Sequence, residues 1–141
     1  MSSTSSAPKP ALHRAPSGPE ETCILLVEDD EECRRVIVRS LRGLGYVVCG
    51  AGSARAALAV YQALQPALVI TDLFMPGCDG VQLIHDLKRM DPGVSMAVVT
   101  GLLPGDPRVR AAINGGARAV LFKPFTPEEL DEVLGVALGE G

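Results

Sequence analysis

Side chains that can bind a metal ion or a phosphate follow four apolar segments of this chain, at the point where each segment ends. Glu28 and Asp29 follow the first of these segments, and Asp72 follows another. Thr100 and Lys123 end two more. If the segments are parallel strands of one sheet, their carboxyl ends share one edge and bring these five side chains together. The residue types then favour a site for a divalent metal ion and a phosphoryl group.

The three carboxylates of this set would repel one another. At about 4 Å each like-charged pair costs ~1 kcal/mol or more, depending on the local dielectric, so a cation must lie close by. Mg²⁺ suits such a place because it prefers oxygen ligands, keeps several waters and bridges to phosphate oxygens. The competing explanation is that acidic residues 28–32 only begin a helix, where the helix dipole favours them. We accept that explanation for residues 30–32 and predict that Glu28, Asp29 and Asp72 bind Mg²⁺.

Lys123 and Thr100 could each contact a phosphoryl group, although both have simpler explanations. A lysine taken alone is usually a solvated surface residue, but Lys123 lies directly between an apolar segment and Pro124, at the sheet edge expected for Asp72. A fixed ammonium there can neutralise a phosphoryl oxygen on the side opposite the metal. Thr100 could cap its strand, or its hydroxyl could donate a hydrogen bond to a second phosphoryl oxygen.

The elements that must position these residues alternate between apolar strands and amphipathic helices. The apolar segments begin near residues 23, 46, 68, 96 and 119. Their spacing of roughly 22 to 28 residues is the length of one strand, one helix and two short loops. Right-handed crossovers then give a doubly wound α/β fold, with a five-stranded parallel sheet in the order 2-1-3-4-5. In that order strand 2 is an edge strand, and strand 2 is also the one without a candidate side chain at its end.

Helix signals separate the apolar segments. The predicted helices cover residues 33–44, 53–64, 81–90, 108–114 and 126–138. Ser53 is a typical N-cap for the second helix. Thr126 and Glu129 have the spacing of a capping box, and Pro127 suits the first helical position, so the last helix is predicted to begin there.

The composition suits one compact domain and excludes several classes of protein. The chain has 141 residues, of which 47% are hydrophobic, enough for one buried core. Its formal charge of −4 gives no basic surface for nucleic acid or for an anionic membrane, and we expect neither partner. The longest apolar runs have about five residues, far fewer than the ~20 that span a bilayer.

The cysteines do not form a metal-binding pattern. The chain has four, with no C-x-x-C pair among them, so a zinc module is not expected. Three of them fall in apolar or helical segments, which favours buried, reduced thiols and a cytoplasmic location.

Residues 1–21 differ in composition from the rest of the chain. They contain four prolines, five serines and a single apolar pair, Ala11-Leu12. Such a segment cannot bury enough apolar surface to order itself. We therefore expect a disordered tail over 1–21 and one domain over 22–139.

A dinucleotide-binding oxidoreductase is the main alternative from another class. Gly50 and Gly52 follow a strand and precede a helix, and Asp72 lies 20 residues after Gly52, as in the fingerprint of such enzymes. Arg55 replaces the third glycine of that fingerprint and would crowd the helix against its strand, and the chain is too short for a second nucleotide-binding half. A phosphatase with an aspartyl nucleophile is also disfavoured, because Phe74 stands where a second acid is wanted.

Five short motifs occur in order along the chain: Ile24–Asp29, Val69–Gly77, Asp79-Gly80, Val98–Thr100 and Leu121–Phe125. Together they resemble the receiver domain of two-component response regulators, over about residues 22–139, and an ordered set is far more specific than any single motif. The resemblance implies a flavodoxin-like receiver fold and a phosphoacceptor in a two-component or phosphorelay system, similar to the stand-alone chemotaxis regulators. It further implies a signalling module that catalyses its own aspartyl phosphorylation and dephosphorylation, rather than an enzyme.

The resemblance also implies a role for each site residue. Asp72 is the phosphoacceptor, and Thr100 and Lys123 bind the phosphoryl group. The implied Mg²⁺ ligands are Glu28, Asp29, Asp72 and the backbone carbonyl of Phe74. The Lys123-Pro124 peptide bond is expected to be cis.

The implied partners are proteins. A histidine kinase or a histidine phosphotransfer protein donates the phosphoryl group, and a downstream target contacts the fourth helix, fifth strand and fifth helix. The chain departs from the family at the switch position, where receivers usually carry Tyr or Phe and this chain has Val120. The chain stops one turn past the fifth helix, so we expect a stand-alone receiver or a receiver fragment. An adaptor of the same fold that is not phosphorylated stays open, although such scaffolds tend to lose the acidic pocket.

Overall fold

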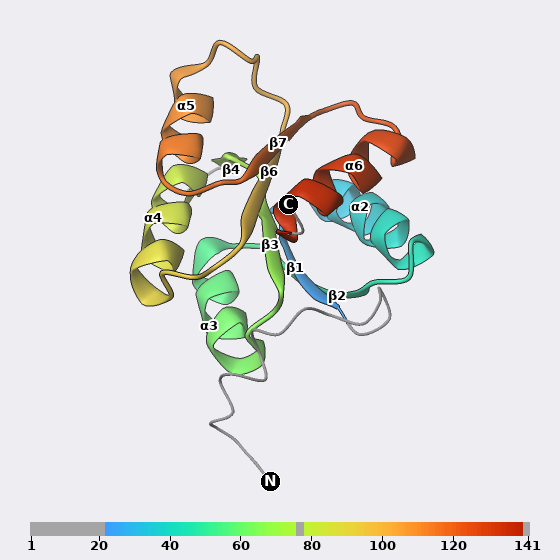
Figure 1. The fold of residues 1–141 in the computed structure, drawn as a ribbon, viewed down its shortest axis with the longest axis horizontal. Coiled ribbons are helices and arrows are strands. Elements are labelled where there is room, and N and C mark those ends of the chain that lie inside the picture. The colour runs from blue at the N-terminus through green and yellow to red at the C-terminus, as the bar shows by residue number, and fades with distance from the viewer. Residues whose placement is uncertain (1–21, 76–77, 140–141) are drawn as a thin grey trace, which may run out of the picture.

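A five-stranded parallel sheet forms the centre of the computed structural model, which describes residues 22–75 and 78–139 (Figure 1). The strands are β1 (Cys23–Val27), β2 (Val47–Ala51), β3 (Leu68–Thr71), β6 (Met96–Thr100) and β7 (Ala119–Phe122). They lie in the order β2-β1-β3-β6-β7, and every neighbouring pair is parallel. This arrangement confirms the predicted doubly wound α/β fold and the order 2-1-3-4-5.

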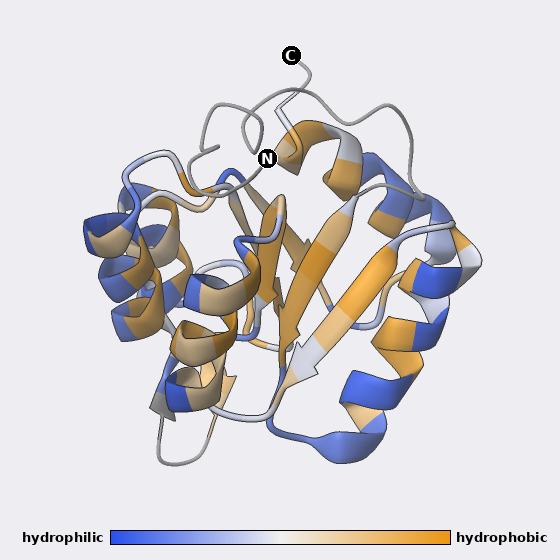
Figure 2. Ribbon diagram, turned by 90° about the horizontal axis from the view of Figure 1, so that it is seen from below, coloured by the Kyte–Doolittle hydropathy of each residue, from blue (hydrophilic) through white to orange (hydrophobic). Residues whose placement is uncertain are grey.

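Helices cover both faces of the sheet, as Figure 1 shows. One face carries α2 (Glu31–Gly43) and α6 (Pro127–Ala137); the other carries α3 (Ala54–Leu64), α4 (Gly80–Met90) and α5 (Pro107–Asn114). Successive strand residues face opposite sides, so Ile24 packs under α2 and α6 while Leu25 packs under α3, α4 and α5. Figure 2 shows apolar strands between helices whose outer faces are polar. A strand that is apolar throughout therefore serves two cores.

Polar caps begin the helices where the sequence predicts them. The Ser53 hydroxyl accepts a backbone hydrogen bond from the first turn of α3. Thr126 and Glu129 form the predicted capping box of α6, each side chain accepting from the backbone N–H of the other. Asp30 is the N-cap of α2, which confirms the helix-capping explanation for that residue. A cap of this kind typically stabilises a helix by ~1 kcal/mol.

A short antiparallel hairpin between β3 and α4 is not predicted by the sequence. It consists of β4 (Phe74–Met75) and β5 (Cys78–Asp79), and it pairs Phe74 with Asp79. Strands of two residues are too short to leave an alternating pattern. The hairpin places the N-cap of α4, Asp79, beside the residue that lies two positions after Asp72.

The tail expected over 1–21 lies outside the described residues. Among the helices of the described ranges, none is both long enough and apolar enough to cross a bilayer.

A buried tyrosine links two helices at the edge of the sheet opposite the carboxyl ends. The Tyr61 hydroxyl on α3 donates a hydrogen bond of 2.5 Å to Oδ2 of Asp91, the C-cap of α4. Burial and this bond to a carboxylate raise the pKa of Tyr61 well above its usual value. We expect Tyr61→Phe to lower the free energy of unfolding by about 1–2 kcal/mol at neutral pH, because Asp91 loses a donor. Urea denaturation measures this, and Tyr46→Phe is the control, since its hydroxyl is half-buried without a side-chain acceptor among the described residues.

The same bond predicts a pH dependence. Because the pKa of Tyr61 is higher in the folded than in the unfolded protein, its stabilisation is complete below the unfolded pKa of about 10 and is lost as the pH rises above it. The stability difference between wild type and Tyr61→Phe should therefore shrink in that alkaline range. A difference that stays constant there would contradict the assignment.

Candidate functional site

The polar ends of four strands lie at one edge of the sheet. β1, β3, β6 and β7 are consecutive neighbours, and β2 lies outside them at the edge. The residues directly before Glu28 and Asp72 are paired across β1 and β3. Thr100 is paired with the residue directly before Lys123. The structure therefore brings together side chains that are up to 95 positions apart in the chain.

A shared lysine ammonium lies at the centre of this group. Nζ of Lys123 donates to Oε1 of Glu28 and to Oδ2 of Asp72, both at 3.0 Å. Glu28 and Asp72 are 3% and 7% exposed, so both carboxylates are removed from water. A buried carboxylate needs a charged partner, and here one ammonium serves two of them.

Burial and the ion pairs act in opposite directions on this cluster. Burial raises the pKa of Glu28, and the charge of Asp72 raises it further, while Lys123 opposes both. Burial alone would lower the pKa of the Lys123 ammonium, but its hydrogen bonds to Glu28 and Asp72 outweigh burial and raise that pKa above its usual value. Lys123 is therefore charged at neutral pH. Two acidic side chains share this one ammonium, a composition that favours a further cation.

The carboxylate of Asp72 is held from two sides. Its Oδ1 accepts from the backbone N–H of Leu73 at 2.7 Å and from that of Phe74 at 3.3 Å, and its Oδ2 faces Lys123. The Thr71 hydroxyl, which is buried, donates to the carbonyl of Asp72 at 2.9 Å. Both the side chain and the backbone of Asp72 are thus fixed before any ligand arrives.

Gly80 contributes to this fixation by having no side chain. It begins α4, and a Cβ at this position would lie 2.3 Å from the carbonyl oxygen of Asp72 and 2.6 Å from Cα of Leu73. Only glycine allows the helix to begin so close to the Asp72 backbone. In the sequence Gly80 is part of a motif, but nothing there indicates this close approach.

The candidate Mg²⁺ ligands are not gathered into a ready-made cluster. Within the described ranges, no three His, Cys, Asp or Glu side chains are close enough to hold a metal ion. Lys123 stands between Glu28 and Asp72, and Asp29 is half-buried directly after Glu28. Carboxylates with a backbone carbonyl nevertheless suit Mg²⁺, which takes few protein ligands and keeps its waters. The chemistry of the donor set therefore fits this ion.

Thr100 and Val120 lie on β6 and β7, the two strands that follow β3 in the sheet. Thr100 is fully buried, and its Oγ1 accepts from the backbone N–H of Leu102 at 3.2 Å. The backbone N–H of Lys123 donates to the Thr100 carbonyl at 2.8 Å, so the two phosphoryl-binding candidates are joined. Val120 is half-buried on β7 and packs against the core under α3, α4 and α5. The Lys123-Pro124 bond is cis, as expected from the resemblance.

Two neighbours of Glu28 are missed by sequence reasoning. Nη1 of Arg34 donates to the Glu28 carbonyl at 2.5 Å, and Sγ of Cys33 donates to Oε1 of Glu28 at 3.5 Å. Arg34 also packs against the glycine pair at the end of β2, where a Cβ on either Gly50 or Gly52 would lie 3.2 Å from its side chain. A side chain of the chain itself therefore lies against these glycines, which weakens the case for a dinucleotide site.

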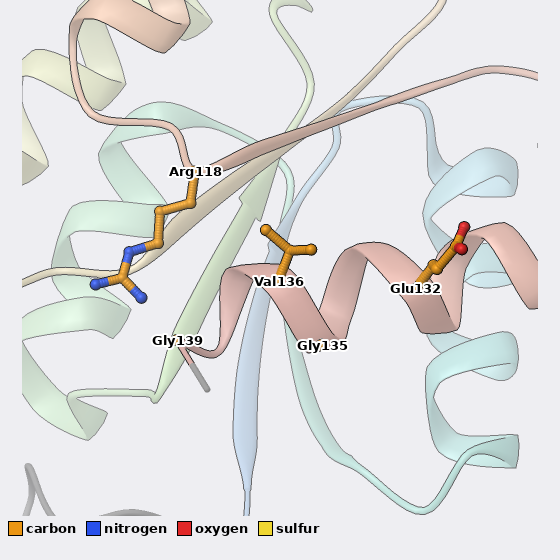
Figure 3. Close-up of a pocket in the computed structure, with 5 residues that line it drawn as sticks. All are labelled: Arg118, Glu132, Gly135, Val136 and Gly139. Atoms are coloured by element: carbon orange, nitrogen blue, oxygen red, sulfur yellow. The ribbon is translucent and has the colours of Figure 1, made fainter. Parts of the chain in front are cut away.

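A shallow hollow lies at the other end of β7 (Figure 3). It is lined by Arg118, Glu132, Gly135, Val136 and Gly139. Nη1 of Arg118 donates to the Ala137 carbonyl, and Gly139 has the left-handed φ of +78° that brings its backbone close under this guanidinium. The arginine therefore caps the end of α6, and the hollow is separate from the group around Asp72.

Comparison with known proteins places the described site in a family context. A family model for the response regulator receiver domain matches residues 24–135. The C4-dicarboxylate transport transcriptional regulatory protein DctD of Rhizobium meliloti is 36% identical over 108 residues, which are 76% of this chain and 23% of DctD. The chemotaxis protein CheY of Thermotoga maritima is 30% identical over 112 residues, which are 79% of this chain and 92% of CheY.

Solved structures agree with this comparison. A CheY-like response regulator receiver domain protein from Methanospirillum hungatei superposes with a TM-score of 0.78 at 28% identity, over 84% of this chain and 94% of that one. The curated relatives differ in length, however: the chain spans under a quarter of DctD and 44% of the ycf27 regulator of Porphyridium aerugineum. The shared part is the receiver domain.

Proposed function

The chain belongs to the response regulator receiver domain family, and on that premise we propose that Asp72 is the residue that accepts the phosphoryl group, within a domain over 22–139. Members of this family act in two-component signalling, so the chain is a phosphoacceptor module. One observation carries the choice of residue: the Asp72 carboxylate is buried, held by two backbone N–H groups, and shares the Lys123 ammonium with Glu28.

The proposed reaction is a transfer from a phosphohistidine of the donor protein. An Asp72 carboxylate oxygen attacks phosphorus, the new O–P bond forms as the P–N bond to the donor imidazole breaks, and that imidazole keeps the electron pair and takes up a proton. Lys123 neutralises charge on the transferring group, and the Thr100 hydroxyl donates to one of its oxygens. Since the carboxylate is already fixed, the contribution of the protein is positioning and charge stabilisation.

We place Mg²⁺ at Glu28, Asp29, Asp72 and the backbone carbonyl of Phe74. The ion would neutralise charge on the phosphoryl oxygens. Lys123, which here contacts both Glu28 and Asp72, then serves the phosphoryl group as a second cation.

The partners in this proposal are a histidine kinase or a histidine phosphotransfer protein and a downstream protein. The downstream surface is α5, β7 and α6, with Val120 at the switch position. Ile113 on α5 and Val136 on α6 support this choice, because both are large apolar side chains that are at least half exposed. The transcriptional role stated in the name of DctD belongs to that protein.

Two further features complete the proposal. The domain hydrolyses its own phosphoryl group, because the groups that stabilise transfer to Asp72 also stabilise transfer to water. It resides in the cytoplasm, which the free, half-buried Cys23, Cys33 and Cys49 support.

The direct test uses a small acyl phosphate as donor. We expect the wild-type protein to gain one acid-stable, base-labile phosphoryl group in Mg²⁺ and none in a chelator, as measured by intact mass. A protein that gains no such group under these conditions would refute the proposal.

Asp29→Ala tests the metal site. We expect the Mg²⁺ affinity to fall about tenfold or more, because a directly coordinating carboxylate is lost. Isothermal titration calorimetry measures the affinity. Asp30→Ala is the matched control, since it removes the same charge from the next residue, whose side chain caps α2. Equal affinities of the Asp29→Ala and Asp30→Ala proteins would contradict the assignment of Asp29.

A further inference from the structure

A cation–π contact joins the loop after Asp72 to the first turn of α5. Cζ of Arg108 lies over the ring of Phe74, 5.7 Å from its centroid. Phe74 follows β3, and Arg108 is the second residue of α5, which follows β6. Because β3 and β6 are neighbours in the sheet, the contact bridges the two loops that leave adjacent strands. Asp72 begins one of these loops, and Thr100 directly precedes the other.

Arg108 is held in place from its own side. Asp106, the N-cap of α5, accepts from Nε and Nη2 of Arg108 at 3.0 and 2.8 Å and from its backbone N–H at 2.9 Å. The hydrogen bonds from Arg108 lower the pKa of Asp106 to about 2, so the pair is charged at neutral pH. A planar guanidinium that is fixed in this way can also stack on an aromatic ring.

Phe74 links this cation to the phosphoacceptor. Its backbone N–H donates to Oδ1 of Asp72, while its side chain is 59% exposed. An aromatic side chain with so little packing changes rotamer rapidly unless a neighbour restrains it. Arg108 supplies that restraint from the opposite loop.

We propose that Arg108 is a positioning residue of the phosphoryl site: it holds the Phe74 ring between the two loops and thereby prolongs the life of the phosphoryl group on Asp72. This inference rests on the proposed role of Asp72. In hydrolysis, a water oxygen attacks phosphorus, the bond from phosphorus to the Asp72 oxygen breaks, the carboxylate re-forms, and inorganic phosphate and a proton are released. Phe74 lies two residues after Asp72 and donates its backbone N–H to Oδ1 of Asp72, so a ring restrained there would lower the rate by restricting the approach of that water.

The strength of the contact sets the size of the effect. A cation–π pair at an exposed site changes an equilibrium about two- to fivefold. We therefore expect Arg108→Gln, which removes the cation, to shorten the lifetime about threefold. Phe74→Leu keeps an apolar side chain but removes the ring and should act equally. The protein with both substitutions should decay no faster than either single variant, because both remove one contact.

The experiment labels each protein with a small acyl phosphate in Mg²⁺, removes the donor and follows phosphoryl loss by intact mass. Arg110→Gln is the matched control: Arg110 is exposed on the same helix, and a residue two positions further along does not face Phe74. It should decay like the wild type. Phe74→Tyr keeps a ring and should retain the wild-type lifetime only where Arg108 is present, which a purely structural role would not require.

The outcomes separate this inference from the proposed function. Two results together support it. The protein with both substitutions decays no faster than either single variant, and Phe74→Tyr keeps the wild-type lifetime when Arg108 is present. Wild-type decay of labelled Arg108→Gln, or effects of the two substitutions that multiply, would overturn it while Asp72 keeps its role. A wild-type protein that takes no phosphoryl group overturns the proposed function and this inference with it. The melting temperature of each variant shows whether it remains folded. If the phosphoryl lifetimes of the variants correlate with their melting temperatures, and not with the presence of the Arg108–Phe74 contact, the result counts against the inference.

Discussion

An Asp72→Asn protein should take no phosphoryl group from a small acyl phosphate in Mg²⁺, whereas the wild type should take one. The amide is uncharged and lacks the nucleophilic carboxylate, so the expected effect is complete loss of labelling. The fold should persist, because the side-chain oxygen of asparagine can still accept from the backbone N–H of Leu73. Substitution also removes one of two buried carboxylates that share Lys123, so the melting temperature should not fall.

Intact mass with and without Mg²⁺ measures this loss. Asp86→Asn is the matched control, because it makes the same chemical change at a carboxylate on α4 that pairs with Arg89. The Asp86→Asn protein should be labelled like the wild type. Labelling of the Asp72→Asn protein to the wild-type extent would show that another residue accepts the phosphoryl group.

Gly80→Ala should destabilise the protein strongly for the addition of one methyl group. The new Cβ would lie 2.3 Å from the Asp72 carbonyl oxygen and 2.6 Å from Cα of Leu73, and both neighbours are backbone atoms. Overpacking costs about 1–3 kcal/mol or more where the surroundings cannot yield, and we expect at least ~2 kcal/mol here. Relief of the clash must also move Asp72, so labelling should slow by about 100-fold, the typical cost of a 1 Å misplacement.

Gly135→Ala provides the matched comparison, measured by urea denaturation and by the rate of labelling. Gly135 lies inside α6, and a Cβ there meets no atom within 4 Å. Alanine should therefore stabilise the helix by roughly 0.5–1 kcal/mol relative to glycine, and labelling should be unchanged. A Gly80→Ala protein that is as stable as the wild type would mean that α4 shifts away without cost.

Regular features of the fold are predictable from the sequence because they repeat. Apolar segments at even spacing are enough to predict five strands, and the polar residue at the end of a strand then predicts the shared edge of the sheet. The capping box at Thr126 and the cap at Ser53 are equally local, since each depends on residues within one turn. Such signals are present in the chain whatever its tertiary structure.

The remaining features depend on contacts between distant residues. Arg34 fills the space left by Gly50 and Gly52, which from the sequence alone resembles part of a nucleotide-binding loop. The contact of Arg108 with Phe74 joins residues 34 positions apart on different loops. Neither pair has a spacing rule, because the sheet topology and the side-chain rotamers together decide whether they meet.

For the candidate site residues, the sequence predicts the shared location but not the individual contacts. Asp72, Glu28 and Lys123 are predicted at one edge of the sheet, and both carboxylates do contact Lys123 there. That a single ammonium would bridge both carboxylates is not predictable, since the reach of the lysine side chain depends on the backbone positions of three strands. Asp29 follows the same strand as Glu28, but the sequence does not indicate which of these two adjacent carboxylates contacts Lys123.

The ammonium of Lys123 has a further consequence as a counter-ion that is covalently part of the chain. Because it already neutralises much of the charge on Glu28 and Asp72, folding does not have to wait for a divalent cation. A ligand that only the folded state binds adds stability with the logarithm of its concentration above its Kd. For the proposed Mg²⁺ this gain should be small, because Lys123 already neutralises part of the charge that the ion would meet. If Mg²⁺ binds as proposed, the fold should therefore depend little on free magnesium, and the ion should exchange as a substrate does.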